Sequence, residues 1–219
     1  MTPLLSLIAA TLLSLGDVDS TELRSGLQPG ETAGAFYVDD VTGPRAGSSL
    51  CYACAFAKRT VINIQTRKLT AELGQLLRSI DRSVSSASKM TADSKHAFLV
   101  YLTDDPDTAE AELVAFAKKH TLVNIPLTLY DDPTGPPDYK ISPKAETTVL
   151  MWSNTEVKAN HAFAPGKFDV GAVAEVWGRA RQHLGIPDER IELRSLGQID
   201  EELGKLVGKV VILDLWALW

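Results

Sequence analysis

The sequence predicts an α/β fold, with helices packed on a sheet that contains a parallel crossover. Residues 61–65 (VINIQ) form a short apolar run typical of a central strand. Residues 69–84 place leucine, isoleucine and valine on one helical face. Residues 97–102 (AFLVYL) are continuously apolar, as expected for a strand buried on both faces. Strand, helix and strand in this order indicate a parallel crossover unit.

Each of the three expected helices has a start signal. Thr70 can cap the first, which has an acidic residue in its first turn. The second begins near Pro106, where Asp107 is followed by a glutamate three residues on. Asp169 caps the third, and Gly185 follows its last turn.

The other expected strands are short. One is expected at residues 35–38. Another, at residues 125–130, should be short or at an edge, because Pro126 cannot donate a ladder hydrogen bond. Residues 147–152 and 156–162 indicate a hairpin, joined by a turn of Ser, Asn and Thr.

The length of the chain limits the number of domains, and its charge argues against nucleic-acid binding. A chain of 219 residues can hold one ample domain, or one domain and a fragment of another. Apolar residues make up 45% and charged residues 23%, which is ordinary for a globular protein. The net charge of −6 gives no electrostatic footprint for nucleic acid. We therefore expect no nucleic-acid partner.

The amino terminus indicates export. Residues 1–15 contain no charged side chain and are rich in Leu, Ile and Ala. A run of about 15 residues is too short to span a bilayer well. Residues 14–16 supply small side chains at offsets suited to signal cleavage. We expect a signal peptide at residues 1–16, a linker at 17–30, a periplasmic or secreted location and no stable membrane span. A frayed apolar leader or a terminal anchor is the alternative.

The two cysteines, Cys51 and Cys54, form a C-x-x-C pair ahead of residues 61–65. Beside a β-α-β pattern, such a pair indicates a thioredoxin-like redox motif. In an oxidising compartment it rests as a disulfide unless a partner reduces it. We assign Cys51 as the attacking thiol and Cys54 as the resolving one, with Lys58 and Arg59 able to stabilise a thiolate. The alternative is a structural or vestigial disulfide that closes a tight loop.

Haem attachment or metal binding at the cysteine pair would need further ligand residues. Haem attachment needs a histidine after the second cysteine, where Ala55 stands. A zinc site needs two further Cys or His ligands. A copper site of both cysteines and His161 is conceivable, because soft thiolates select copper. His96, His120 and His183 are expected at the surface or at helix caps. We expect no cofactor and no resident metal.

The order of elements resembles the thioredoxin superfamily, most closely its peroxiredoxin-like branch. Residues 125–135 (IPLTLYDDPTG) are similar to the peroxiredoxin segment that leads to a D-P-x-G turn. Residues 146–150 stand where that family begins the strand before its final hairpin. The resemblance implies one domain at residues 31–185 with a three-layer fold, a central mixed sheet flanked by helices.

Three departures from the family argue against peroxidase or ordinary thioredoxin chemistry. The family's reactive cysteine follows the central strand, but residues 66–70 here are TRKLT. Glu146 stands where peroxiredoxins have an arginine that supports the thiolate. Thr147 and Thr148 stand where thioredoxins have a cis-proline.

The last fourteen residues carry a second resemblance, to a different segment of known proteins. Residues 206–219 (LVGKVVILDLWALW) are similar to the start of thiol-disulfide reductases, up to the position of their first active-site cysteine. We expect a short helix at residues 199–206, and a tail at 186–219 that resembles the truncated start of a second thioredoxin-like domain. A native strand added to the sheet edge is the alternative.

Two functions remain open from the sequence. The first is thiol–disulfide redox exchange through Cys51 and Cys54, as a possible oxidoreductase outside the cytoplasm. Its partner would be a redox protein or a thiol substrate. The second is a non-catalytic interaction or accessory domain with a structural disulfide.

Overall fold

The computed structural model describes residues 23–187 and Lys205. The expected signal peptide at residues 1–16 lies outside the described residues. So do the expected helix at 199–206, apart from Lys205, and the apolar run at 210–219.

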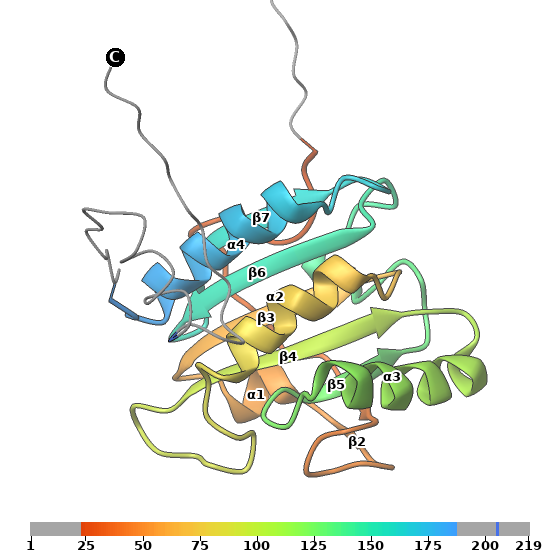
Figure 1. Ribbon diagram of the computed structural model, residues 1–219, viewed down its shortest axis with the longest axis horizontal. Helices are drawn as coiled ribbons and strands as arrows, with labels where there is room; N and C mark the ends of the chain where they lie inside the picture. Colours follow the sequence, from red (N-terminus) through yellow and green to blue (C-terminus); the bar gives the residue numbers. More distant parts are fainter. Residues whose placement is uncertain (1–22, 188–204, 206–219) are drawn as a thin grey trace, which may run out of the picture.

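The described residues form an α/β fold around one seven-stranded mixed sheet (Figure 1). The elements are β1 (Val38–Asp40), β2 (Ser49–Leu50), α1 (Tyr52–Ala55), β3 (Thr60–Thr66), α2 (Ala71–Asp81), β4 (Lys95–Leu102), α3 (Pro106–His120), β5 (Leu127–Tyr130), the 3-10 helix η1 (Pro137–Tyr139), β6 (Thr147–Ser153), β7 (Glu156–Phe163) and α4 (Val170–His183). The strand order is β2-β1-β5-β4-β3-β6-β7. Strands β3, β4 and β5 are parallel, and all other pairs are antiparallel. The predicted fold class is confirmed.

The predicted crossover is the centre of the sheet. Strand β3 pairs with β4 in parallel, and α2 connects them. The Thr70 hydroxyl caps α2 by accepting a 3.1 Å hydrogen bond from the Leu73 backbone N–H. This bond satisfies one of the donors that every helix start leaves unpaired.

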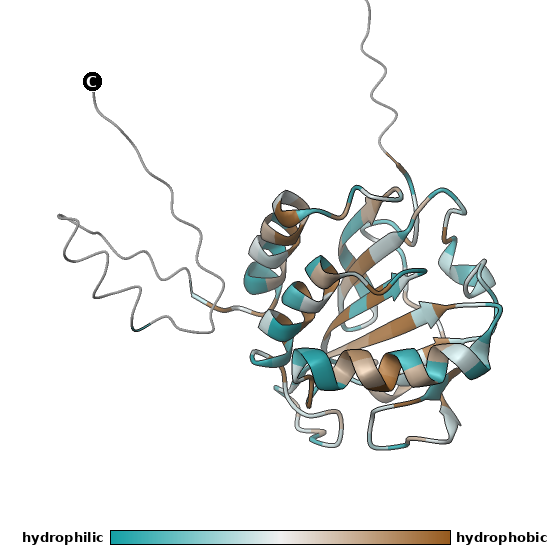
Figure 2. Ribbon diagram, turned by 45° about the vertical axis from the view of Figure 1, so that its right-hand side comes forward, coloured by the Kyte–Doolittle hydropathy of each residue, from teal (hydrophilic) through white to brown (hydrophobic). Residues whose placement is uncertain are grey.

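The two faces of the sheet have separate cores. Helices α2, α3 and α4 cover one face, and their side chains pack on Ile62 and Ile64 of β3. Val61 of β3 points to the opposite face, which holds α1 and most of the buried aromatic rings. The alternation follows from the two-residue period of a strand. Figure 2 shows the central strands as the most hydrophobic part of the ribbon.

Some element positions differ from the predicted ones. The first strand is Val38–Asp40 rather than residues 35–38, because its pairing with β2 begins at Val38 and its pairing with β5 begins at Asp39. Strand β5 is short, as expected, but lies inside the sheet between β1 and β4. Pro126 precedes it and needs no N–H there, and its carbonyl accepts from Leu99 N–H. The cap of α3 is Asp105, two residues before the predicted signal.

The packed region also extends upstream into residues that were assigned to the linker. The Ser25 hydroxyl lies 2.7 Å from the Thr148 hydroxyl, and Asn160 donates to the carbonyls of Ser25 and Leu27. Gly26 has a φ of 82° and lies against the Thr148 side chain, so a side chain at this position would clash.

Candidate redox site

The two cysteines are joined in a disulfide on α1. Cys51 follows β2 directly and is the N-cap of α1, and Cys54 lies within the helix. Their Cα atoms are 5.2 Å apart, and the S–S bond is 2.06 Å long. A helix of four residues has too few turns to give a periodic sequence signal, so the sequence pattern predicts no helix here.

The two sulfur-bearing residues differ in their access to solvent. Cys51 is only 8% exposed and packs within the aromatic core of its face of the sheet. Cys54 belongs to the exposed residues. The backbone N–H of Cys54 donates a 3.0 Å hydrogen bond to the Cys51 sulfur. Cys51 is therefore a buried residue whose sulfur accepts a hydrogen bond, and Cys54 is an exposed residue.

Tyr52 holds α1 onto the sheet. Its ring stacks on Phe56 at 5.2 Å between centroids and lies 5.6 Å from the Phe98 ring of β4. Its hydroxyl donates a 2.8 Å hydrogen bond to Oδ2 of buried Asp40 on β1. Burial raises the pKa of Tyr52, and the bond to the Asp40 carboxylate raises it further. The phenol therefore stays protonated and remains a donor.

Phe56, which stacks on Tyr52, also contacts a buried histidine. Its ring stacks on the His96 ring at 4.1 Å with parallel planes. His96 is fully buried, and its Nε2 lies 2.8 Å from the Ser94 hydroxyl. Burial, followed by the nearby Arg59 charge, lowers the pKa of His96 to about 4. A neutral imidazole therefore lies under α1 at neutral pH, and the expectation of a surface His96 is wrong.

Arg59 connects α1 to the loop before β4. Its Nη1 donates to the Ala55 carbonyl at 3.2 Å, while Nη2 and Nε donate to the carbonyls of Met90 at 3.1 Å and Thr91 at 3.0 Å. The guanidinium thus binds three backbone oxygens and no sulfur. Lys58, the other predicted cation, is exposed.

The position of the family's reactive cysteine is occupied by a structural arginine. Arg67 follows β3, and its Nε donates to the Pro133 carbonyl at 2.7 Å. Its Nη1 donates to the carbonyls of Ser142, at 3.1 Å, and Ala145. Burial lowers the pKa of Arg67. The guanidinium thus joins the end of β3 to the loop carbonyls of Pro133, Ser142 and Ala145, within the segment 66–70 where the resemblance places the family's reactive cysteine.

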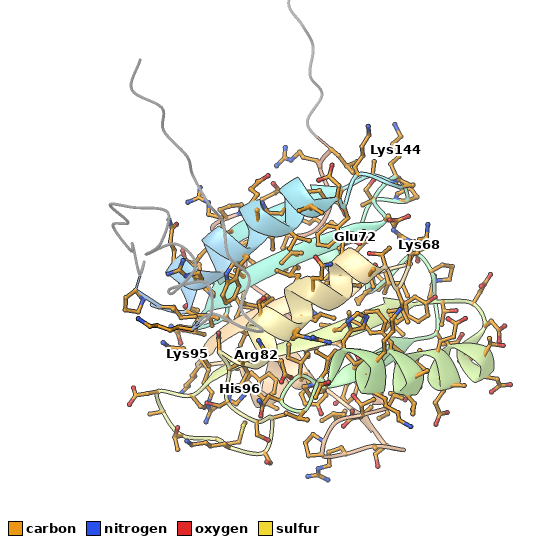
Figure 3. All side chains as sticks on the ribbon, in the orientation of Figure 1. Lys68, Glu72, Arg82, Lys95, His96 and Lys144 are labelled. Atoms are coloured by element: carbon orange, nitrogen blue, oxygen red, sulfur yellow. A yellow bond between two sulfur atoms is a disulfide. The ribbon has the colours of Figure 1, made fainter. Side chains whose placement is uncertain are left out.

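The neighbouring family positions are also occupied by structural contacts. The hydroxyls of Thr66 and Thr147 lie 3.0 Å apart across the β3–β6 pair. Lys68 lies 4.0 Å from Glu146, the residue in place of the supporting arginine. Among residues 23–187 no peptide bond is cis. Figure 3 shows Lys68 and His96 at opposite ends of the sheet. The described part of the chain therefore has no peroxiredoxin or thioredoxin site at the end of β3.

A copper site would need Cys51, Cys54 and His161 close together, but the fold places them apart. His161 lies on β7, and its Nδ1 is 3.1 Å from Glu175 of α4. Helix α4 packs on the face of the sheet opposite to α1 and the cysteines. Within residues 23–187, no cluster of three or more Cys, His, Asp or Glu side chains has the geometry to hold a metal ion.

The sequence assigned no functional role to Asp40 or Tyr52, and the prediction placed His96 at the surface or at a helix cap. A signal for His96 was present, because His96, Phe98 and Val100 alternate along β4 and so share a face. The contact between Tyr52 and Asp40 had no such signal, since it joins residues of different elements.

Comparison with known proteins identifies the fold. No protein-family model matches the sequence, and no curated protein matches it. The structure is similar to that of a candidate protein disulfide isomerase from Bacteroides thetaiotaomicron, with a TM-score of 0.52 and 15% identity over 74% of this chain and 93% of the other. It is also similar to a hypothetical protein from Sinorhizobium meliloti, with a TM-score of 0.51 and 10% identity over 77% and 92% of the two chains.

A peroxiredoxin structure is also among the similar ones. Peroxidoxin BcpB from Mycobacterium tuberculosis gives a TM-score of 0.48 and 14% identity over 74% of this chain and 99% of the other. The similarity to the Bacteroides thetaiotaomicron structure, at a TM-score of 0.52, shows that the protein has a thioredoxin-like fold, as the element order predicted. Its disulfide lies on α1, on the face of the sheet opposite to α2.

Proposed function

We propose that this protein exchanges thiols and disulfides with a redox partner protein or a thiol substrate, through Cys51 and Cys54. The observation that carries the proposal is the difference in exposure within the disulfide: Cys54 is open to a partner, and Cys51 is buried. An exchange site needs one sulfur that a partner thiolate can reach, and a second that accepts or returns electrons within the protein.

The size of the disulfide loop supports exchange over a purely structural role. The bridge joins residues with a sequence separation of 3. Closing so short a loop removes little chain entropy from the unfolded state, on the order of 2 kcal/mol. Helix α1 is also held by contacts of Tyr52 and Arg59. We therefore expect the helix to keep its place when the disulfide is reduced.

We also propose that the protein works outside the cytoplasm. The apolar residues 1–15 support this, because they resemble a secretory signal. An oxidising compartment would keep Cys51 and Cys54 as the disulfide seen here. None of the helices in residues 23–187 has the length and apolarity of a membrane-spanning helix. Cell fractionation with an antibody to the protein tests the location.

A non-catalytic accessory role is the second candidate. Arg67 favours it, since this residue fills the family's reactive position with hydrogen bonds to loop carbonyls. A protein that kept the fold and lost the family site would be built in this way. In that case the Cys51–Cys54 bridge would remain oxidised and would take part in no exchange.

Turnover distinguishes the two candidates. The oxidised protein is mixed with insulin and dithiothreitol, and reduction of the insulin disulfides is followed over time. Exchange at Cys51 and Cys54 predicts acceleration over dithiothreitol alone, and no acceleration by the double variant Cys51→Ser/Cys54→Ser. Equal rates for the wild type and the double variant would support the accessory role instead.

A further inference from the structure

We propose that partner thiols attack Cys54 and that Cys51 is the leaving and resolving sulfur, the reverse of the order assigned from the sequence. The inference rests on the proposed exchange function and deepens it. It starts from the disulfide geometry, since an incoming thiolate must approach one sulfur in line with the S–S bond, from the side opposite to the other sulfur. Only a sulfur with free space on that side can be attacked.

Cys54 is exposed, so a partner thiolate can reach its sulfur from solvent. Cys51 is 8% exposed and belongs to the buried cluster that also contains Tyr52 and Phe56. Attack on the Cys51 sulfur would need a partner to approach through this packed side. The buried position thus excludes Cys51 from the first step and leaves Cys54 as the residue that touches the partner.

The leaving sulfur has a donor in place. The Cys54 N–H already donates to the Cys51 sulfur at 3.0 Å. When the S–S bond breaks, the electron pair remains on this sulfur, and a hydrogen bond to a charged acceptor is stronger than one to a neutral acceptor. The donor thus stabilises Cys51 as a thiolate more than it stabilises the disulfide.

The complete reaction balances as two exchanges. A partner thiolate attacks Cys54, a mixed disulfide forms between the partner and Cys54, and Cys51 leaves as a thiolate that takes a proton from water. A second partner thiolate then attacks the partner's sulfur in the mixed disulfide, and Cys54 leaves as a thiolate. Two partner thiols are oxidised to one disulfide, and Cys51 and Cys54 are reduced to thiols. In the reverse direction, Cys54 attacks and Cys51 resolves.

Trapping the intermediate tests the order. The oxidised protein is mixed with reduced glutathione, quenched with acid within seconds, and alkylated with N-ethylmaleimide. Cleavage after Arg45 and Lys58 leaves both cysteines in one peptide, which fragmentation in a mass spectrometer can resolve. We expect glutathione on Cys54 and N-ethylmaleimide on Cys51. Glutathione on Cys51 would overturn the order and leave the exchange function intact. No glutathione on either residue would remove the exchange function itself.

Single-cysteine variants give an independent measurement, because the chain has only two cysteines. Cys51→Ser retains Cys54, and Cys54→Ser retains Cys51. We expect folded Cys51→Ser to form a mixed disulfide with oxidised glutathione at least about tenfold faster than folded Cys54→Ser, because access controls the rate. In denaturant, where both thiols are exposed, the rates should converge. Equal or reversed rates in the folded variants would contradict the proposed order.

Discussion

The Tyr52 hydroxyl donates a 2.8 Å hydrogen bond to Asp40 Oδ2, and this contact joins the redox helix to the first strand. The same carboxylate accepts from the backbone N–H groups of Gly43 and Arg45, so it also orders the turn between β1 and β2. Cys51 follows this hairpin and precedes Tyr52. The disulfide is thus held between two segments that one buried carboxylate organises.

Replacing Tyr52 with Phe tests this contact. The ring packing remains, but Asp40 loses one of its donors while buried. We expect Tyr52→Phe to lower the free energy of unfolding by about 1–3 kcal/mol, the range for a hydrogen bond to a charged group. Urea denaturation measures it. Tyr37→Phe is the matched control, because Tyr37 is 67% exposed and should change stability little. Equal stabilities of the two variants would show that the bond contributes nothing.

Arg67 should matter for stability and not for exchange. Arg67→Met removes the donors to the carbonyls of Pro133, Ser142 and Ala145. We expect a loss of about 1–3 kcal/mol in urea denaturation, because the partly buried carbonyls of Ser142 and Ala145 lose their donor. Insulin reduction by the folded variant should match the wild type. Lys68→Met is the control, since the exposed Lys68 ammonium lies 4.0 Å from Glu146 and this pair should contribute at most about 1 kcal/mol. A loss of exchange in folded Arg67→Met would place chemistry at the end of β3 after all.

His96 should make stability depend on pH in a defined window. Its pKa in the folded protein is lowered to about 4, so the unfolded chain binds a proton more readily. Stability from the neutral imidazole is full above the unfolded value of about 6.5, and is lost as pH falls from there towards 4. The loss amounts to at most about 3 kcal/mol.

Comparison with His96→Gln isolates this effect. All other ionisable groups are the same in both proteins, so their contributions cancel in the difference. Urea denaturation of both proteins between pH 4 and 7 should give a steeper decline for the wild type. The same slope in both would mean that His96 is not buried as a neutral group.

Reduction of the disulfide should weaken the fold only modestly. The bridge closes a loop with a sequence separation of 3, and its loss should cost on the order of 2 kcal/mol. The reduced protein should therefore remain folded, with a far-ultraviolet circular dichroism spectrum like that of the oxidised protein. Unfolding on reduction would instead indicate a structural bridge, as the accessory role requires.

The sequence predicted best those features that depend on residues within a single helix or hairpin. Helices α2 and α4 begin after the predicted caps Thr70 and Asp169, because a cap acts through bonds within its own first turn. The hairpin of β6 and β7 was also predicted. Its turn residues Asn154 and Thr155 have positive φ, as a tight turn with the twist of a hairpin requires.

The sequence was least informative where distant segments decide the outcome. The first strand begins at Val38 because its pairing with β2 starts there, followed by pairing with β5 from Asp39, and no local pattern encodes either pairing. The cysteine pair was found from its spacing, but the exposure of each sulfur depends on packing against β4 and β1. That packing reverses the roles we assign to Cys51 and Cys54.

The reduction potential of the Cys51–Cys54 pair tests the central claim most directly. The protein is equilibrated in glutathione buffers of graded ratio, and the fraction of reduced protein is measured after alkylation. An exchange site predicts a potential between about −270 and −120 mV, the range of thiol–disulfide exchange proteins. A potential well below about −300 mV would mark an inert structural bridge and contradict the account.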